Sequence, residues 1–170
     1  PTNVISITDG QILLKPELFF SGVRPAMDVG ASVSRVSAAK TKAMGAVSKT
    51  LKGDLSRYHE VQAFAQFGSS DLDTATRNLL NRGEKLTEIL KQGQFAPLAL
   101  GEEVVALYAA GKIEDLPTAS VRRFESELLA FMHENHQDLL DEITSTEQLS
   151  DATRDKVDGA VETFKKSFKA

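Results

Sequence analysis

Apolar residues follow two different patterns along this chain, and the pattern changes near residue 40. The segments Val4–Ile7 and Gln11–Leu14 are short and apolar, with Thr8-Asp9-Gly10 between them. Alternating β-branched residues on either side of such a turn are typical of paired strands. We therefore predict strand, tight turn and strand, with a further strand or extended segment at Val29–Val36. Pro16–Phe20 predicts one helical turn, since Pro is tolerated at a helix start.

From residue 41 onward, apolar residues recur every three or four positions, which is the spacing of one helical face. These stripes predict a bundle of about five helices. Gly53 predicts an irregularity in the helix expected over Met44–Val61, and Gly83 predicts close packing of the helix expected over Leu72–Leu90. Gly111 is expected to end the third helix and Ser150 to cap the last. The stripes are Met44–Val61, Leu72–Leu90, Val104–Tyr108, Val121–Ile143 and Val157–Phe168.

The predicted fold is an α/β fragment in residues 1–40 followed by an all-α helical bundle in residues 41–170. The few strands of the first part cannot form a sheet that buries both of its faces. We therefore expect the missing sheet partners to lie upstream in a longer polypeptide, or in another one. A start at Pro1 without Met fits a longer or processed polypeptide.

Composition and charge exclude several classes of protein. The 170 residues include 20 Lys and Arg against 24 Asp and Glu, a formal net charge of −4, so no basic surface for nucleic acid is expected. Cysteine is absent, which excludes disulfide frameworks, Cys-ligated metal sites and thiol nucleophiles. No apolar run reaches the ~18–20 residues that a membrane-spanning helix needs. We therefore expect neither a nucleic-acid partner nor a spanning helix.

Two histidines, His133 and His136, stand three residues apart on a predicted helix, a spacing that metal ligands also use. Two ligands are too few without a converging third and fourth, and both histidines fall near the polar side of the helix. We interpret them as surface residues and predict no metal site. Neighbouring carboxylates such as Asp71 and Asp73 are interpreted in the same way, as helix caps or solvated positions.

The segment Ser32-Val33-Ser34-Arg35 places a planar cation beside two hydroxyl groups. This combination suits a phosphoryl oxygen, where Arg can bind two oxygens or stabilise charge in the transition state. The alternative is an Arg paired with a local carboxylate or carbonyl, and residue chemistry alone favours this alternative. No G-x-x-x-x-G-K-[ST] motif occurs, so the sequence contains no phosphate-binding loop of its own.

Separated motifs occur in the order Pro1–Ile12, Gly22–Ala26, Val29–Val36, Ala63–Ser69 and Leu90–Gln94. In this order and approximate spacing they closely resemble the α subunit of F-type ATP synthase. The resemblance implies the last third of that subunit. Residues 1–40 would be the closing strands of its RecA-like nucleotide-binding domain, and residues 41–170 its C-terminal helical bundle domain. The P-loop of the family would lie upstream.

The resemblance also implies catalytic roles for three residues. Arg35 matches the arginine finger of the family, which reaches the γ-phosphate in the catalytic site of the neighbouring β subunit. Ser34 adjoins this finger, and Ser6 matches a position near the phosphate at the same interface. The resemblance thus implies that this protein completes a catalytic site in its neighbour.

Arg24, Pro25, Gln92 and Gln94 match the wall around the adenine of the α subunit's own, non-catalytic nucleotide. The implied cofactor is ATP or ADP with Mg²⁺, whose phosphate and metal ligands are expected outside this segment. The implied function is that of the regulatory, non-catalytic subunit of a complex that couples ATP synthesis and hydrolysis to ion translocation. The segment alone is expected to be inactive.

The implied partners are the β subunit in an alternating hexamer, the γ rotor subunit near Phe67–Asp73, and other ATP synthase subunits. Membrane association is expected only through the complex, at the cytoplasmic face of a bacterial inner membrane or the matrix face of a mitochondrial one. Two departures from the family are Asp28, where Asn is usual, and a loop one residue shorter after Arg35. The alternatives are a subunit of another RecA-type hexameric ATPase and a helical interaction module without a nucleotide role.

Overall fold

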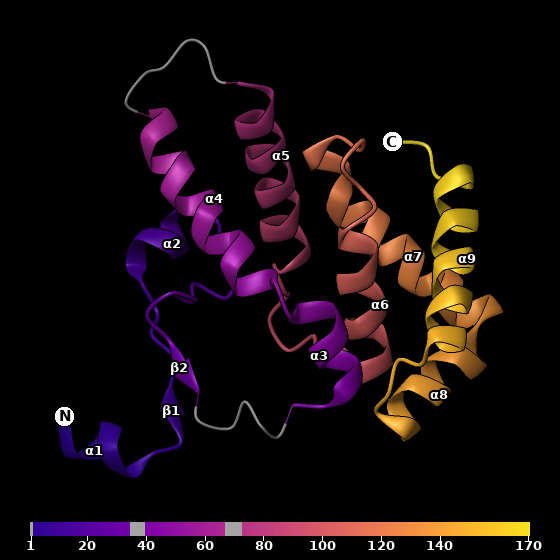
Figure 1. Cartoon of the computed structure of the whole chain (residues 1–170), viewed down its shortest axis with the longest axis horizontal. Coiled ribbons are helices and arrows are strands. Elements are labelled where there is room, and N and C mark those ends of the chain that lie inside the picture. The colour runs from indigo at the N-terminus through magenta and orange to yellow at the C-terminus, as the bar shows by residue number, and fades with distance from the viewer. Residues whose placement is uncertain (1, 35–39, 67–72) are drawn as a thin grey trace.

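The computed structural model describes residues 2–34, 40–66 and 73–170, and they form a helical bundle with a small extended segment beside it (Figure 1). The elements are α1 (Thr2–Ile7), β1 (Gly10–Gln11), α2 (Pro16–Phe20), β2 (Val33–Ser34), α3 (Lys42–Ser48), α4 (Leu51–Gln66), α5 (Thr74–Ile89), α6 (Leu100–Ala110), the 3₁₀ turn η2 (Thr118–Ser120), α7 (Val121–Asn135), α8 (Gln137–Thr146) and α9 (Asp151–Ser167). The helical bundle predicted from residue 41 onward is confirmed.

The strand prediction for Val4–Ile7 is wrong, because these residues lie in α1. Even a short helix forms some of its backbone hydrogen bonds within itself, whereas a strand forms its ladder only with a neighbour. Only Gln11 of the second predicted strand lies in β1, and of the third segment, as far as its residues are described, Val33 and Ser34 lie in β2. The two short strands are antiparallel, with Gly10 opposite Ser34. The described residues thus contain this two-stranded sheet, and a RecA-like origin of the segment remains a prediction.

Helix α6 occupies the middle of the bundle and contacts α3, α5, α7 and α8. Its residues Val104, Val105 and Ala109 are completely buried. A helix that is apolar around most of its circumference must be covered on all sides, which explains this central position. Phe124 of α7 and Val161 of α9 are also completely buried, so the core continues to the C-terminal helix.

Two of the predicted helices are each divided in the structure. The first stripe forms α3 and α4, which are separated at residues 49–50, and Gly53 lies inside an unbroken α4. The stripe Val121–Ile143 forms α7 and α8, because His136 has a φ of −142° that interrupts the helical ladder. Apolar residues continue on both sides of this break, so the sequence pattern alone does not reveal it.

Several helix ends occur where the sequence predicts them. Ser150 caps α9 by accepting a hydrogen bond of 3.1 Å from the backbone N–H of Thr153, and Gly111 follows the last residue of α6. Asp73 caps α5 in the same way, through the backbone N–H of Thr76 at 3.0 Å. Among the described helices, none is long and apolar enough to cross a membrane.

Candidate functional site

Arg24 lies in the loop between α2 and β2, with its guanidinium stacked on Phe19. The guanidinium carbon stands 3.7 Å from the centroid of the Phe19 ring. Nη1 donates hydrogen bonds to the backbone carbonyl of Phe19 and, at 3.2 Å, to that of Val23. The Arg24 residue is nevertheless exposed. The loop therefore holds a planar cation in one orientation at the surface, with Pro25 next to it.

Gln92 lies at the start of the loop between α5 and α6 and forms a backbone hydrogen bond with Arg24. Its N–H donates to the carbonyl oxygen of Arg24 at 2.8 Å, and its side-chain Nε2 donates to the carbonyl of Ala96 at 3.0 Å. Gln94 is exposed two residues further along the same loop. The structure thus brings Arg24 and Gln92 together, and places Pro25 and Gln94 on the two segments that carry them.

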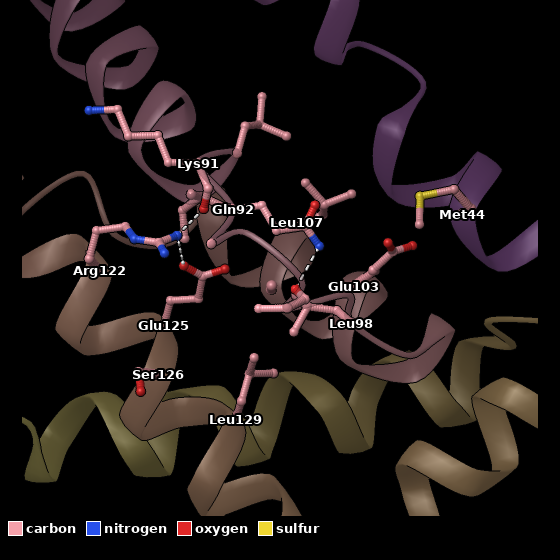
Figure 2. A pocket seen from close by; sticks show the side chains of 15 residues that line it. Met44, Lys91, Gln92, Leu98, Glu103, Leu107, Arg122, Glu125, Ser126 and Leu129 are labelled. Atoms are coloured by element: carbon pink, nitrogen blue, oxygen red, sulfur yellow. Dashed lines mark hydrogen bonds and ion pairs between the residues drawn. The ribbon is translucent and has the colours of Figure 1, made fainter. Parts of the chain in front are cut away.

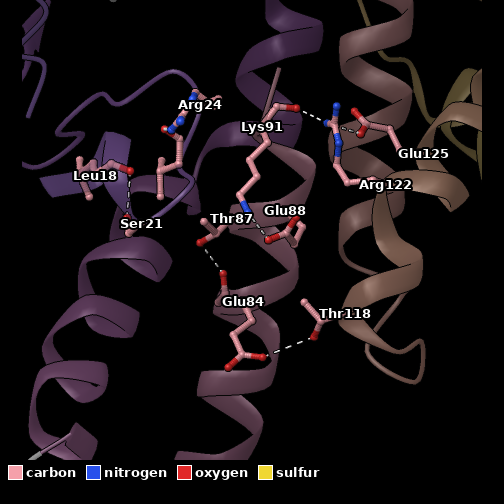
Figure 3. A network of polar contacts seen from close by, with 12 residues as sticks. Leu18, Ser21, Arg24, Glu84, Thr87, Glu88, Lys91, Thr118, Arg122 and Glu125 are labelled. Atoms are coloured by element: carbon pink, nitrogen blue, oxygen red, sulfur yellow. Dashed lines mark hydrogen bonds and ion pairs between the residues drawn. The ribbon is translucent and has the colours of Figure 1, made fainter. Parts of the chain in front are cut away.

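The peptide group between Lys91 and Gln92 forms hydrogen bonds at both of its polar atoms, and Figure 3 shows the one between its carbonyl oxygen and Arg122. Its N–H donates to Arg24, and its carbonyl oxygen, which belongs to Lys91, accepts a hydrogen bond from Arg122 Nη1. Because a peptide group is planar and its N–H and C=O point in opposite directions, one rigid unit links the Arg24 loop to α7. This link joins segments that are far apart in the sequence.

Arg122 and Glu125 of α7 complete this arrangement, and sequence analysis did not select either of them. Arg122 Nη1 stands 2.9 Å from Glu125 Oε2, and Glu125 is 8% exposed. Burial raises the pKa of Glu125, and the nearby Arg122 guanidinium opposes that rise. The sequence did contain one signal for Glu125, because this residue follows Val121 by four positions and so falls on the apolar face of the helix. A carboxylate there needs a partner.

A cavity of about 410 Å³ lies beside the Gln92 loop, between α3, α6 and α7 (Figure 2). Of the sequence-predicted binding residues that the structure describes, Gln92 lines this cavity, and Arg24, Pro25 and Gln94 do not. Its volume is in the range of small-molecule pockets. Gln92 is therefore the residue, among these four, that both contacts the Arg24 segment and lines the cavity.

The predicted catalytic residues lie in the N-terminal segment. Ser6 is in α1, and its Oγ donates to the carbonyl of Asn3 at 2.8 Å. Ser34 is exposed at the end of β2, opposite Gly10. Arg35 lies outside the described residues. The structure therefore does not test whether these side chains meet a phosphate.

Two further sequence expectations concern Asp28 and the segment Phe67–Asp73. Asp28 pairs with Lys15, with Nζ 2.5 Å from Oδ2, and this contact lowers the pKa of the Asp28 carboxyl. Its charge is thus compensated locally rather than by Arg24. Of the segment Phe67–Asp73, only Asp73 lies in the described part of the molecule, where it caps α5.

His133 makes protein contacts at both ring nitrogens. Nδ1 lies 2.7 Å from Gln137 Oε1, and Nε2 lies 2.7 Å from Glu102 Oε1. Hydrogen bonding to Gln137 and then to Glu102 raises the pKa of His133. His136 ends α7, so the two histidines do not share one helix face as metal ligands would. The described residues contain no group of three or more side chains that could hold a metal ion.

A comparison with protein families matches residues 40–164 to the family described as ATP synthase alpha/beta chain, C terminal domain. The match extends over more than half of the sequence and includes Gln92 and Gln94. It begins after Ser6, Arg24, Pro25, Ser34 and Arg35, so it bears on the helical bundle and not on the N-terminal segment.

Proposed function

Because this protein belongs to the family of the C-terminal domain of ATP synthase alpha and beta subunits, we propose that it is part of the α subunit of rotary F1 ATP synthase. In this role it is the regulatory, non-catalytic partner of the β subunit. The family itself includes both α and β subunits. The choice of α rests on the N-terminal motifs, which resemble that subunit.

The observation that carries the nucleotide-binding role is the hydrogen bond of 2.8 Å from the Gln92 N–H to the Arg24 carbonyl. It joins the two segments that would form the adenine wall. One face of the Arg24 guanidinium is covered by Phe19, and the residue is exposed. A fixed guanidinium of this kind can stack on an aromatic base with its other face. Pro25 and Gln94 complete the proposed wall.

In this proposal ATP or ADP binds at the Arg24 site with Mg²⁺, and the ligands for phosphate and metal come from elsewhere in the subunit. The residues described here fit a purine base and not the phosphates, because the sequence has no phosphate-binding loop. When bound, Mg²⁺ would neutralise phosphate charge. The part of this protein is to orient the base through Arg24 and the loop that begins at Gln92.

We further propose that Arg35 acts in the catalytic site of the neighbouring β subunit, with Ser34 and Ser6 beside it. A guanidinium supplied by a neighbouring subunit stabilises charge that develops as the γ-phosphoryl bond is made or broken. Ser34, which precedes Arg35 in the sequence, ends the β2 strand and is exposed. The segment Phe67–Asp73 is proposed to face the γ rotor subunit.

The test is the kinetics of complexes reassembled with the β and γ subunits. Arg35→Ala should slow turnover by roughly 10³–10⁵-fold with a much smaller effect on nucleotide binding. Arg35→Lys should not restore the rate, because Lys keeps the charge but lacks the planar fork.

The matched variant is Arg24→Ala, which removes the same charge from the same segment. It should weaken nucleotide binding at the non-catalytic site and largely spare turnover. Near-normal turnover with Arg35→Ala would contradict the catalytic role. Failure to assemble with β would favour another RecA-type ATPase, and assembly without any nucleotide effect would favour an interaction module.

A further inference from the structure

The cavity between α3, α6 and α7 has apolar walls and two acidic side chains on opposite sides (Figure 2). Leu98, Leu107 and Leu129 supply much of the apolar wall. Figure 2 shows Glu125 on the side of Arg122, whereas Glu103 reaches towards Met44. Arg24, Pro25 and Gln94 of the proposed nucleotide site do not line this cavity, whereas Gln92 belongs to both. Its composition, apolar with a few polar groups, is typical of pockets that bind small organic molecules.

The two carboxylates differ in their partners. Glu125 is paired with Arg122, at 2.9 Å. Glu103 is half-buried, and within the described ranges no cation or hydrogen-bond donor contacts its carboxylate. Burial and repulsion from Glu102 raise the pKa of Glu103. A partly desolvated carboxylate without a partner gains from any cation that can enter the cavity.

We propose that this cavity is a binding site for a small apolar amine. Its ammonium group would pair with Glu103, and its hydrocarbon body would pack against Leu98, Leu107 and Leu129. The charges favour a cation over an anion, because Arg122 pairs with Glu125 and Lys91 pairs with Glu88, a residue outside the cavity lining, whereas Glu103 has no such partner among the described residues. The cavity volume of about 410 Å³ accommodates a bicyclic hydrocarbon with a short aminoalkyl arm.

Occupancy of this cavity should affect the proposed nucleotide site, and this consequence rests on the proposed function. The cavity is lined by Lys91, Gln92 and Arg122. The Lys91–Gln92 peptide accepts from Arg122 on one side and donates to the Arg24 carbonyl on the other. Because this unit is rigid, a ligand that displaces Arg122 or the loop also displaces Arg24.

The probe for the site is 2-naphthylmethylamine, titrated into the protein with isotope-labelled methionine and leucine methyl groups. We expect saturable shifts of the Met44, Leu98 and Leu129 signals. The neutral 2-naphthylmethanol should bind about tenfold more weakly, since it lacks the charge that pairs with a carboxylate. Absence of saturable shifts with the amine would overturn the proposal.

Glu103→Gln is the decisive variant, because it removes the charge and keeps the size of the side chain. It should weaken amine binding about tenfold. The matched control is Glu127→Gln, also a charge removal, at an exposed position of α7 that pairs with Arg123 and does not line the cavity. Equal amine affinity in Glu103→Gln and Glu127→Gln would overturn the assignment of Glu103.

Ala96→Phe tests the cavity without a change in charge. Ala96 is an exposed loop residue that lines the cavity, so the larger ring should fill the space without disturbing the core. We expect this variant to lose amine binding, and retained binding would place the amine elsewhere.

The coupling is measured on the reassembled complex as the affinity for Mg-ATP at the non-catalytic site, with and without the amine. A several-fold change is expected, and amine binding without any change would overturn the coupling. The methyl shifts need no nucleotide. Failure of the proposed function is therefore distinguishable from failure of the amine site.

Discussion

Gly83 of α5 lies directly against the ring of Tyr58 in α4. A β-carbon on Gly83 would stand 2.2 Å from the ring atoms Cγ and Cδ2 of Tyr58, far inside van der Waals contact. Both residues are buried. The absence of a side chain at Gly83 therefore sets how closely α4 approaches α5, as the sequence predicted.

Gly83→Ala should destabilise the protein by about 1–3 kcal/mol, because the atoms that must move are the base of a buried ring rather than a flexible end. Urea unfolding measures this. The control is Gly53→Ala in α4, where a β-carbon meets nothing within 4 Å. That change should stabilise by about 0.5–1 kcal/mol, through helix propensity alone. A Gly83→Ala protein as stable as Gly53→Ala would contradict the packing argument.

Gly101→Ala should also destabilise, by disturbing the contact between α6 and α8. Its β-carbon would stand 2.6 Å from the backbone oxygen of Leu140, and backbone, unlike a side group, cannot rotate away. We expect a loss of at least about 2 kcal/mol, the upper part of the range for overpacking. The matched control is Gly159→Ala in α9, where a β-carbon would meet nothing within 4 Å, and this change should stabilise the protein through helix propensity. Thermal unfolding of the two variants should therefore shift in opposite directions.

The His133–Glu102 pair predicts a stability contribution that depends on pH. The pKa of His133 is raised above 6.5, so its contribution is complete below pH 6.5 and is lost as pH rises through the folded-state pKa. Burial opposes ionisation of Glu102, but hydrogen bonds from His133 and from the Ala99 N–H hold its pKa below 4.5. Its contribution is complete above pH 4.5 and is lost as pH falls through the folded-state pKa.

The stability lost in His133→Gln, relative to the unchanged protein, should therefore be greatest between pH 4.5 and 6.5. The magnitude should stay below about 1 kcal/mol, because the His133 side chain is 46% exposed. Thermal unfolding as a function of pH measures the difference. High salt should reduce this stability difference between pH 4.5 and 6.5, because it screens the charges. A stability difference that does not change with pH would rule out the ion pair as its cause.

Hydrogen exchange should separate the N-terminal segment from the bundle. Val4 and Ile7 are 62% and 82% exposed, whereas Phe124 and Leu128 are completely buried. Amides of Val4–Leu14 should exchange much faster than those of Val121–Ile143 in the isolated protein, since few buried contacts oppose their local opening. Equal protection of the two ranges would contradict this.

The 170 residues alone should show no ATPase activity and only weak binding of Mg-ATP. Nucleotide affinity comes largely from phosphate and Mg²⁺ contacts, whereas these residues offer contacts for the base through Arg24 and the Gln92 loop. Titration calorimetry measures this. Tight binding of Mg-ATP would place a phosphate site within the 170 residues and contradict the proposed division of roles.

Sequence alone was sufficient where one local pattern decides the structure. The stripes that became α5, α6 and α9 were predicted, and so were the cap at Ser150 and the close packing at Gly83. Each of these depends on helical periodicity, on a side chain that reaches its own backbone, or on a missing side chain. The N-terminal residues Val4–Ile7 show the limit, because their β-branched pattern has no strand neighbour in the described structure and they form a helix.

Only the tertiary structure decided where one helix ends and the next begins, and which distant groups meet. The break at His136 leaves the apolar stripe intact, so nothing in the periodicity marks it. The contacts from the Lys91–Gln92 peptide to Arg24 and Arg122 depend on how α5, α7 and the N-terminal loop pack. Glu103 and Glu125 face one cavity for the same reason. Hydrogen bonds between backbone groups leave no mark in the sequence, because every residue type except proline has the same backbone groups. A contact between segments far apart in the sequence depends on the packing of the whole bundle. Local sequence therefore determines the helices, and tertiary packing determines the site.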